Sequence, residues 1–179
     1  MSDELTARRF SAMAEPHLDA AYNLARWLTR NPHDADDVVQ EAYLRAFRFF
    51  DGFRGGDGRA WLLTIVRNTC YTWMKENRRG ETQLEYDEAD GSLQGEEAAE
   101  LPLHNADPQS LLLRAADGER IEAALKRLPI EFREILVLRE LEEMSYKDIA
   151  VIADLPIGTV MSRLSRARTQ LRRILEKME

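Results

Sequence analysis

Apolar side chains recur every three to four residues along most of the chain, which is the spacing of helices with one buried side. One stripe begins at Phe10 and ends at Leu28, and Pro16 within it can serve as the first residue of a helix. We therefore expect a short helix followed by a longer one there. No segment alternates with period two for long enough to predict a strand. The pattern predicts an all-α fold.

The clearest helix follows the break Asn31-Pro32-His33-Asp34, whose residue types are typical of helix starts. The glycine-rich stretch 51–58 predicts a loop, and a further buried stripe then runs from Leu62 to Trp73. The apolar residues of the helix after the break are Ala35, Val38, Val39, Ala42, Tyr43, Ala46, Phe47 and Phe50.

The second half of the chain repeats these signals. Asp107-Pro108 is typical of an N-cap followed by a first-turn proline, and Pro129 predicts the start of the next helix. Ser145-Tyr146-Lys147-Asp148 has the form of a capping box and predicts a short helix to about Ala153. After the connector 154–157, a final helix is expected from about Gly158 to Lys177.

Charge divides the chain into three parts. The net charge of the chain is −7. Residues 80–120 hold eleven acidic and two basic residues, whereas residues 1–79 hold eleven acidic and twelve basic residues. Such an acidic segment with few apolar residues cannot offset the entropy lost on ordering. We predict two small helical domains, at 1–80 and 108–179, joined by a flexible acidic linker at 81–107. A long loop within a single domain is the alternative.

Composition narrows the classes of function. No apolar run approaches the roughly 20 residues that span a bilayer, so no membrane insertion is expected, and the acidic N-terminus is unlike a secretory signal. Cys70 is the only cysteine, and we expect it to be a core residue. The three histidines are scattered, and no phosphate loop or nucleophile motif occurs. We therefore expect a cytoplasmic protein that is not an enzyme, with no catalytic residue, metal or cofactor.

Two consecutive helices near the C-terminus, the second strongly basic, have the outline of a helix-turn-helix. Between residues 157 and 177 only Glu176 is acidic, and guanidinium groups suit both phosphates and guanine edges. A basic helix that merely faces solvent is the alternative, and it suffices for Arg172 and Arg173. The candidate duplex-binding residues are Thr159, Ser162, Arg163, Ser165, Arg166 and Arg168.

A second polar face lies on the helix from Trp61 to Arg79. Amides, cations and aromatic rings on one face are what single-stranded nucleic acid requires, and the glycine-rich loop before this helix could close over an extruded base. Trp61 and Trp73 could equally belong to the core. The candidates are Phe53, Arg54, Gly55, Arg67, Asn68, Tyr71, Lys75 and Arg78.

A third polar strip lies on the helix that begins at Asp34. Acids in a first turn follow from the helix dipole alone, so the strip could simply face solvent. Its residues are Asp34, Asp37, Gln40, Glu41, Leu44 and Arg45.

Three motifs, at 34–53, 59–79 and 128–168, occur in an order that resembles the extracytoplasmic-function (ECF) group of bacterial sigma factors. The resemblance implies that the 34–48 helix docks on the β′ clamp helices of core RNA polymerase. It also implies that the 59–79 helix and the loop 53–57 recognise and open the minus-ten promoter element. The helix from Gly158 would read the minus-thirty-five element while its domain leans on the β flap, and a cognate anti-sigma factor would hold the protein inactive in a stress or envelope response.

Two positions depart from the family pattern. Met161 lies where several relatives carry a basic residue, which puts a base or phosphate contact there in doubt and suggests a different promoter preference. Asp154 lies where glycine often ends the preceding helix, but aspartate tolerates left-handed backbone. A conventional helix-turn-helix regulator, which binds a palindrome without polymerase, is the competing hypothesis.

We predict that the free chain binds duplex DNA weakly, because both ends are nearly neutral and the middle repels phosphate. Fluorescence anisotropy with a labelled promoter duplex at physiological salt is the measurement. Tight, saturable binding without polymerase would contradict this prediction.

Overall fold

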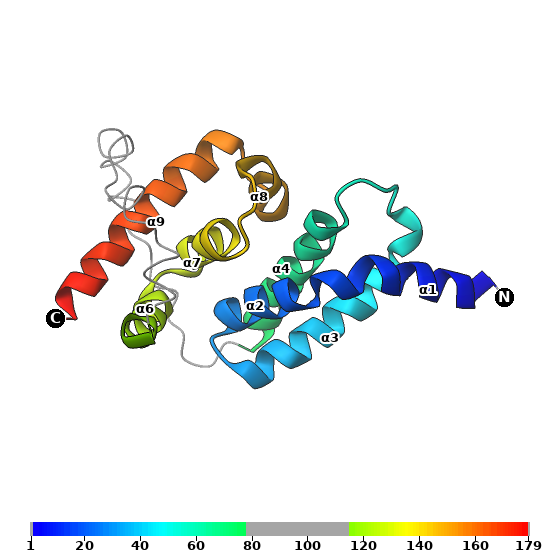
Figure 1. Cartoon of the computed structure of the whole chain (residues 1–179), viewed down its shortest axis with the longest axis horizontal. Helices are drawn as coiled ribbons and strands as arrows, with labels where there is room; N and C mark the ends of the chain where they lie inside the picture. Colours follow the sequence, from blue (N-terminus) through cyan, green and yellow to red (C-terminus); the bar gives the residue numbers. More distant parts are fainter. Residues whose placement is uncertain (1, 78–114, 179) are drawn as a thin grey trace. The chain divides into compact units, whose positions relative to one another are not determined.

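The computed structural model describes residues 2–77 and 115–178. The chain separates into two compact units, the first carrying α1 to α4 and the second α6, α7, α9 and most of α8 (Figure 1). Every regular element within the described ranges is helical, which confirms the all-α prediction there. The expected linker at 81–107, the expected helix start at Asp107-Pro108, and Arg78 lie outside the described residues.

The first unit is built on three helices that pack against one another. It contains α1 (Ser2–Ala14), the 3-10 turn η1 (Glu15–His17), α2 (Leu18–Thr29), α3 (Pro32–Arg48), the 3-10 turn η2 (Phe50–Gly52) and α4 (Gly58–Glu76). Helices α2, α3 and α4 contact each other in all three pairs. The fully buried residues of these helices include Leu24, Leu28, Val38 and Leu63, and Leu62 is buried together with Ala14 and Ala46.

The start of α3 follows the sequence signal closely. The Asn31 side chain accepts hydrogen bonds from the backbone N–H groups of His33, at 2.8 Å, and Asp34, at 3.2 Å. Pro32 occupies the first turn, where its missing N–H has no intrahelical partner to lose. The expected helix start is therefore confirmed.

The start of α2 differs from the prediction. Pro16 lies within η1 and does not open the helix, and α1 and α2 are similar in length, at 13 and 12 residues. A 3-10 turn accommodates proline as readily as a helix start does, because both leave N–H groups unpaired. The expected order of a short and then a longer helix is wrong.

An aromatic cluster holds α1 against the rest of the first unit. The Phe10 ring packs edge-to-face on Tyr43, Phe47 and Phe50, with ring centroids 6.2, 5.4 and 5.4 Å away. The Tyr43 hydroxyl donates to the Ala14 carbonyl at 3.1 Å, and burial raises its pKa to about 12. The Tyr43 hydrogen bond and the Phe10 ring contacts therefore fix the C-terminal end of a mostly exposed α1.

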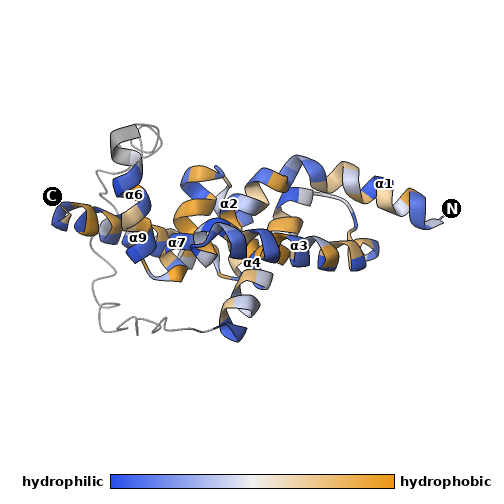
Figure 2. Ribbon diagram, turned by 90° about the horizontal axis from the view of Figure 1, so that it is seen from below, coloured by the Kyte–Doolittle hydropathy of each residue, from blue (hydrophilic) through white to orange (hydrophobic). Residues whose placement is uncertain are grey.

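The second unit contains α6 (Ala115–Arg127), α7 (Ile130–Leu136), the π-helical segment η5 (Val137–Leu141), most of α8 (Tyr146–Ala153) and α9 (Ile157–Lys177). Helix α9 packs on both α6 and α7. In Figure 2 hydrophilic and hydrophobic residues alternate along α9, as expected for a helix with one packed side. The fully buried residues of this unit include Ile135, Leu138, Ile149 and Leu164.

The connections of the helix-turn-helix agree with the sequence. The backbone N–H of Asp148 donates to Ser145 Oγ at 3.1 Å, as the capping box predicts. Asp154 adopts φ 55°, which confirms the left-handed helix end. The sequence does not predict the π-helical turn of η5, because the spacing of its apolar residues also fits an ordinary α-helix.

Replacing Asn31 by Ala should lower the free energy of unfolding of the first unit by about 1 kcal/mol, because two N–H groups lose their acceptor. Asn31→Asp keeps an acceptor and should stay close to the parent. Urea unfolding followed by tryptophan fluorescence reports on this unit alone, since Trp27, Trp61 and Trp73 all lie in it. Equal stability of the alanine and aspartate variants would count against the cap.

Candidate nucleic-acid interface

The N-terminal half of α9 presents polar and basic side chains at the surface of the second unit. Thr159, Ser162, Arg163 and Arg166 are partly exposed, and the Ser162 hydroxyl donates to the Thr159 carbonyl at 3.2 Å. Gly158 is exposed, and a Cβ built on it would meet nothing within 4 Å. A partner could thus approach this end of the helix closely.

Two of the six residues expected on this face do not lie on it. Ser165 and Arg168 are only 7% and 9% exposed. Arg168 follows the core residue Leu164 by four positions, so the helical period places it on the packed side. The expectation that Ser165 and Arg168 point outward is wrong, and the same period could have revealed it.

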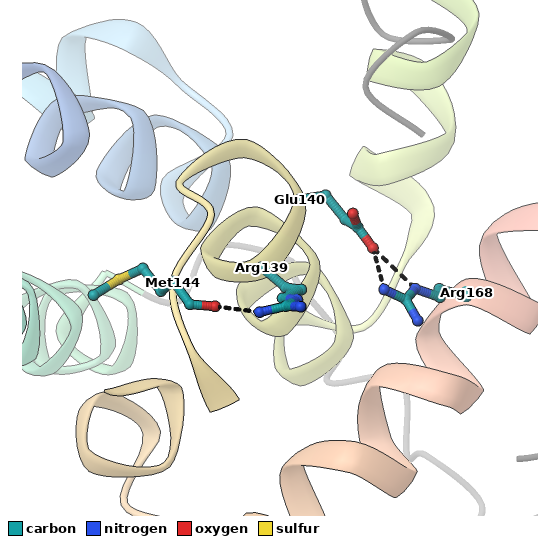
Figure 3. A network of polar contacts seen from close by, with 4 residues as sticks. All are labelled: Arg139, Glu140, Met144 and Arg168. Atoms are coloured by element: carbon teal, nitrogen blue, oxygen red, sulfur yellow. Dashed lines mark hydrogen bonds and ion pairs between the residues drawn. The ribbon is translucent and has the colours of Figure 1, made fainter. Parts of the chain in front are cut away.

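The Arg168 guanidinium is committed to a carboxylate within the unit. Its Nε and Nη2 donate to Glu140 Oε1 at 2.9 and 2.5 Å, across 28 residues of sequence (Figure 3). Both side chains are largely buried. The pair ties η5 to α9 and so helps to set where the basic face of α9 lies.

The neighbouring Arg139 holds the other side of the same segment. Its Nη1 donates to the Met144 carbonyl at 2.8 Å (Figure 3). Its guanidinium also lies over the Tyr146 ring, 4.4 Å from the centroid. Arg139 and Glu140 thus connect η5 to the start of α8 and to α9. Neither residue stood out in the sequence, because nothing local marks a contact made by distant residues.

On α4 the structure brings three of the expected residues together. The Arg67 guanidinium lies 3.9 Å from the centroid of the Tyr71 ring and donates from Nη1 to Asn68 Oδ1 at 3.3 Å. Asn68 and Lys75 are exposed. This outer side of α4 therefore offers an amide, an aromatic ring and cations along one helix.

The loop before α4 is anchored at its start and open at its tip. The Phe53 ring lies 5.0 Å from that of Trp61 and 6.0 Å from that of Phe50, so Phe53 is half-buried. Arg54 and Gly55 are exposed, and Gly55 and Gly56 adopt φ values of 87° and 86°, which L-residues rarely do.

Asp57 ends this loop by accepting a hydrogen bond at Oδ1 from the Ala60 N–H, at 3.2 Å. Trp61 is partly buried against the first unit's aromatic cluster, which favours its core interpretation. Cys70 is fully buried, as expected. The loop is thus clamped at both ends and free between them.

The outer side of α3 combines polar and apolar groups. Asp37, Gln40 and Glu41 are exposed, and Arg45 Nε lies 3.1 Å from Glu41 Oε1. Asp34 is less exposed. Leu44 is 57% exposed in the middle of this strip. Phe47 and Phe49, not among the expected residues, are also exposed.

Comparison with known families assigns both units. Residues 13–80 match the model of Sigma-70 region 2, and residues 118–171 match that of Sigma-70 region 4. The chain is 36% identical to the ECF RNA polymerase sigma-E factor of Escherichia coli K12 over 138 residues, covering 75% of this chain and 70% of that protein. The chain belongs to the ECF family of RNA polymerase sigma factors.

A second ECF relative is similar over nearly the whole chain. The ECF RNA polymerase sigma factor SigE of Mycolicibacterium smegmatis is 32% identical over 175 residues, which are 98% of this chain. The chain spans 65% of the length of that relative.

Two solved structures share the fold. One is the sigma factor RpoE in complex with the anti-sigma factor NepR from Bartonella quintana, with a TM-score of 0.68 and 27% identity over 94% of this chain and 98% of that one. The other is CnrH in complex with the cytosolic domain of CnrY, with a TM-score of 0.65 and 25% identity over 97% and 91%.

Neither a membrane-spanning helix nor a metal-binding cluster occurs among the described residues. None of the helices there combines the length and apolar character that crossing a bilayer needs. Over the same ranges, His, Cys, Asp and Glu side chains form no group of three or more that could hold a metal ion.

Replacing Glu140 by Gln should destabilise the second unit by about 2 kcal/mol, because the largely buried Arg168 guanidinium loses its counter-charge. Hydrogen exchange of the α9 amides should speed up accordingly. Glu131→Gln, at an exposed position of α7, is the matched control and should leave exchange unchanged. Equal exchange rates in the two variants would show that the ion pair contributes little.

Proposed function

We propose that this chain is a promoter-specificity subunit that binds core RNA polymerase and directs transcription initiation. The observation that carries the proposal is the presence of two separate polar reading faces, on α4 and α9, in units that match sigma regions 2 and 4. One chain with two such faces can contact two promoter elements. No catalytic residue, metal or cofactor is needed, because nucleotide addition is the chemistry of the polymerase.

The first unit would recognise and open the minus-ten element. Asn68 offers hydrogen bonds to base edges, while the Arg67–Tyr71 pair offers a stacking platform next to a phosphate-binding cation. The open tip of the loop at Arg54 and Gly55 could close over an extruded base, with Phe53 as its anchor. We extend this surface to Lys75 and Arg78. Unpairing a few bases would be offset by these contacts.

The second unit would place α9 in the major groove of the minus-thirty-five element. The open space at Gly158 allows close approach, and Arg163 and Arg166 can reach phosphates or guanine edges. Thr159 and Ser162 complete the face. Arg168 and Ser165 are left out because their side chains are buried, and Arg168 has the positioning role described above.

The outer strip of α3 would bind the β′ clamp helices of the polymerase. An exposed leucine among carboxylates and an amide suits a protein partner, because burial of Leu44 adds apolar area and the rim stays polar. Asp34, Asp37, Gln40, Glu41 and Arg45 form the rest of this surface. The region 4 unit would lean on the β flap.

We further propose that domains at 1–80 and 108–179 are joined by an acidic linker at 81–107, and that the protein acts in the cytoplasm. The sigma factor RpoE was solved in complex with the anti-sigma factor NepR, and CnrH was solved in complex with the cytosolic domain of CnrY. A cognate anti-sigma factor is accordingly expected here, as part of a stress or envelope response.

The test is in vitro transcription with the full-length chain and core polymerase lacking sigma, on a library of genomic fragments. We expect start sites that appear only when both components are present. Their upstream sequences should share two elements at a constant spacing. Specific binding of the free chain to a palindrome, without any effect on transcription, would instead favour a conventional regulator.

Leu44→Glu tests polymerase binding separately from DNA reading. The measured quantity is the affinity of the chain for core polymerase. The substitution places a charge on an exposed position and should weaken association with core polymerase at least tenfold without unfolding the chain. Arg9→Glu, on the exposed part of α1, serves as a charge-changing control. Unaltered association of the Leu44 variant would contradict the proposed docking surface.

A further inference from the structure

The first turns of α9 carry an apolar side chain that neither the core nor the charge pattern accounts for. Met161 is the fifth residue of α9 and is 51% exposed. The core side of this part of the helix is supplied by Val160 and Leu164, which are buried. Met161 therefore projects beside the packed side, next to the polar Ser162.

The surroundings of Met161 indicate the chemistry of its partner. No acidic residue occurs from Ile157 to Leu175, and Arg163 and Arg166 are partly exposed on the same helix. A polyanion is the partner that this charge distribution favours. Gly158 leaves the helix end open for close approach of that partner.

A thioether has little to offer phosphates or polar base edges. In the major groove the largest apolar group on a base edge is the 5-methyl group of thymine, where cytosine carries only a C5 hydrogen. Residues at the N-terminal end of a recognition helix are the ones that contact base edges. Burying a methyl against Met161 is favourable, whereas any other base at that position lacks the methyl and offers less apolar area to the side chain.

We propose that Met161 is a specificity-determining residue that contacts the 5-methyl group of one thymine in the minus-thirty-five element. The inference rests on the proposed function, because it requires α9 to lie in the major groove. Met161 would then make an apolar contact to the DNA in place of the polar contact that a basic residue at this position would make. The consequence is a preference for thymine where a basic residue would favour guanine or phosphate.

The experiment uses holoenzyme assembled from the full-length chain and core polymerase lacking sigma. Templates with a randomised upstream element are first selected by transcription. Each thymine of the selected element is then replaced by deoxyuridine, which lacks only the 5-methyl group. At one thymine the replacement should reduce promoter binding about fourfold, which is the value expected for one buried methyl.

Met161→Ala completes the cycle. On the thymine template this variant should bind about as weakly as the parent holoenzyme binds the deoxyuridine template, and deoxyuridine should cause no further loss. A merely structural role for Met161 would lower binding to all templates and leave the thymine-to-deoxyuridine ratio unchanged. Val151→Ala, at a 59% exposed apolar position on α8, is the control and should keep the full ratio.

The outcomes are distinguishable. If the holoenzyme selects no promoter at all, the proposed function fails before Met161 is tested. If it selects promoters but no thymine is sensitive to deoxyuridine, or if the sensitivity persists in Met161→Ala, the role of Met161 is overturned. A selected element without thymine would have the same meaning.

Discussion

The side chains of α3, α4 and α9 that can reach a partner are those left outside after each helix has packed one side into a core. With 3.6 residues per turn, only about half of the circumference remains available. On α9 this constraint separates Ser162 and Arg166, which stay accessible, from Arg168, which does not. The proposed reading surfaces are consequences of packing as much as of composition.

Packing also determines how firmly each surface is held. In the first unit, Phe10 and the aromatic residues around it connect α1, α3 and η2, and Phe53 and Trp61 extend the cluster to the loop before α4. In the proposed function the loop tip accepts an extruded base, which requires a tip that can move and ends that stay fixed. An aromatic anchor at one end and the Asp57 cap at the other provide this combination.

In the second unit a short polar network has the equivalent role. Arg139 and Glu140 are adjacent in η5 and bind in different directions, to the start of α8 and to α9 (Figure 3). A π-helical turn changes the direction of successive side chains relative to an α-helix. The departure from regular geometry thus coincides with the point where the two helices of the helix-turn-helix are held to α7.

The sequence by itself determined most of the helices, the caps at Asn31 and Ser145, and the three-part charge pattern, because these depend on composition and on neighbours within about four residues. Asn31, Ser145 and Asp154 have the local roles that their residue types indicate. The same local signals located the polar faces of α3 and α4, and the motif order indicated the ECF family.

Only the tertiary structure decided which members of those faces are available. The pairing of the Arg168 guanidinium depends on Glu140, a residue 28 positions away, and the half-burial of Phe53 depends on rings from other elements. The exposure of Leu44 likewise requires that no other helix of its unit covers that side of α3. Contacts between distant residues leave no periodic trace in the sequence, so they become visible only when the helices are packed.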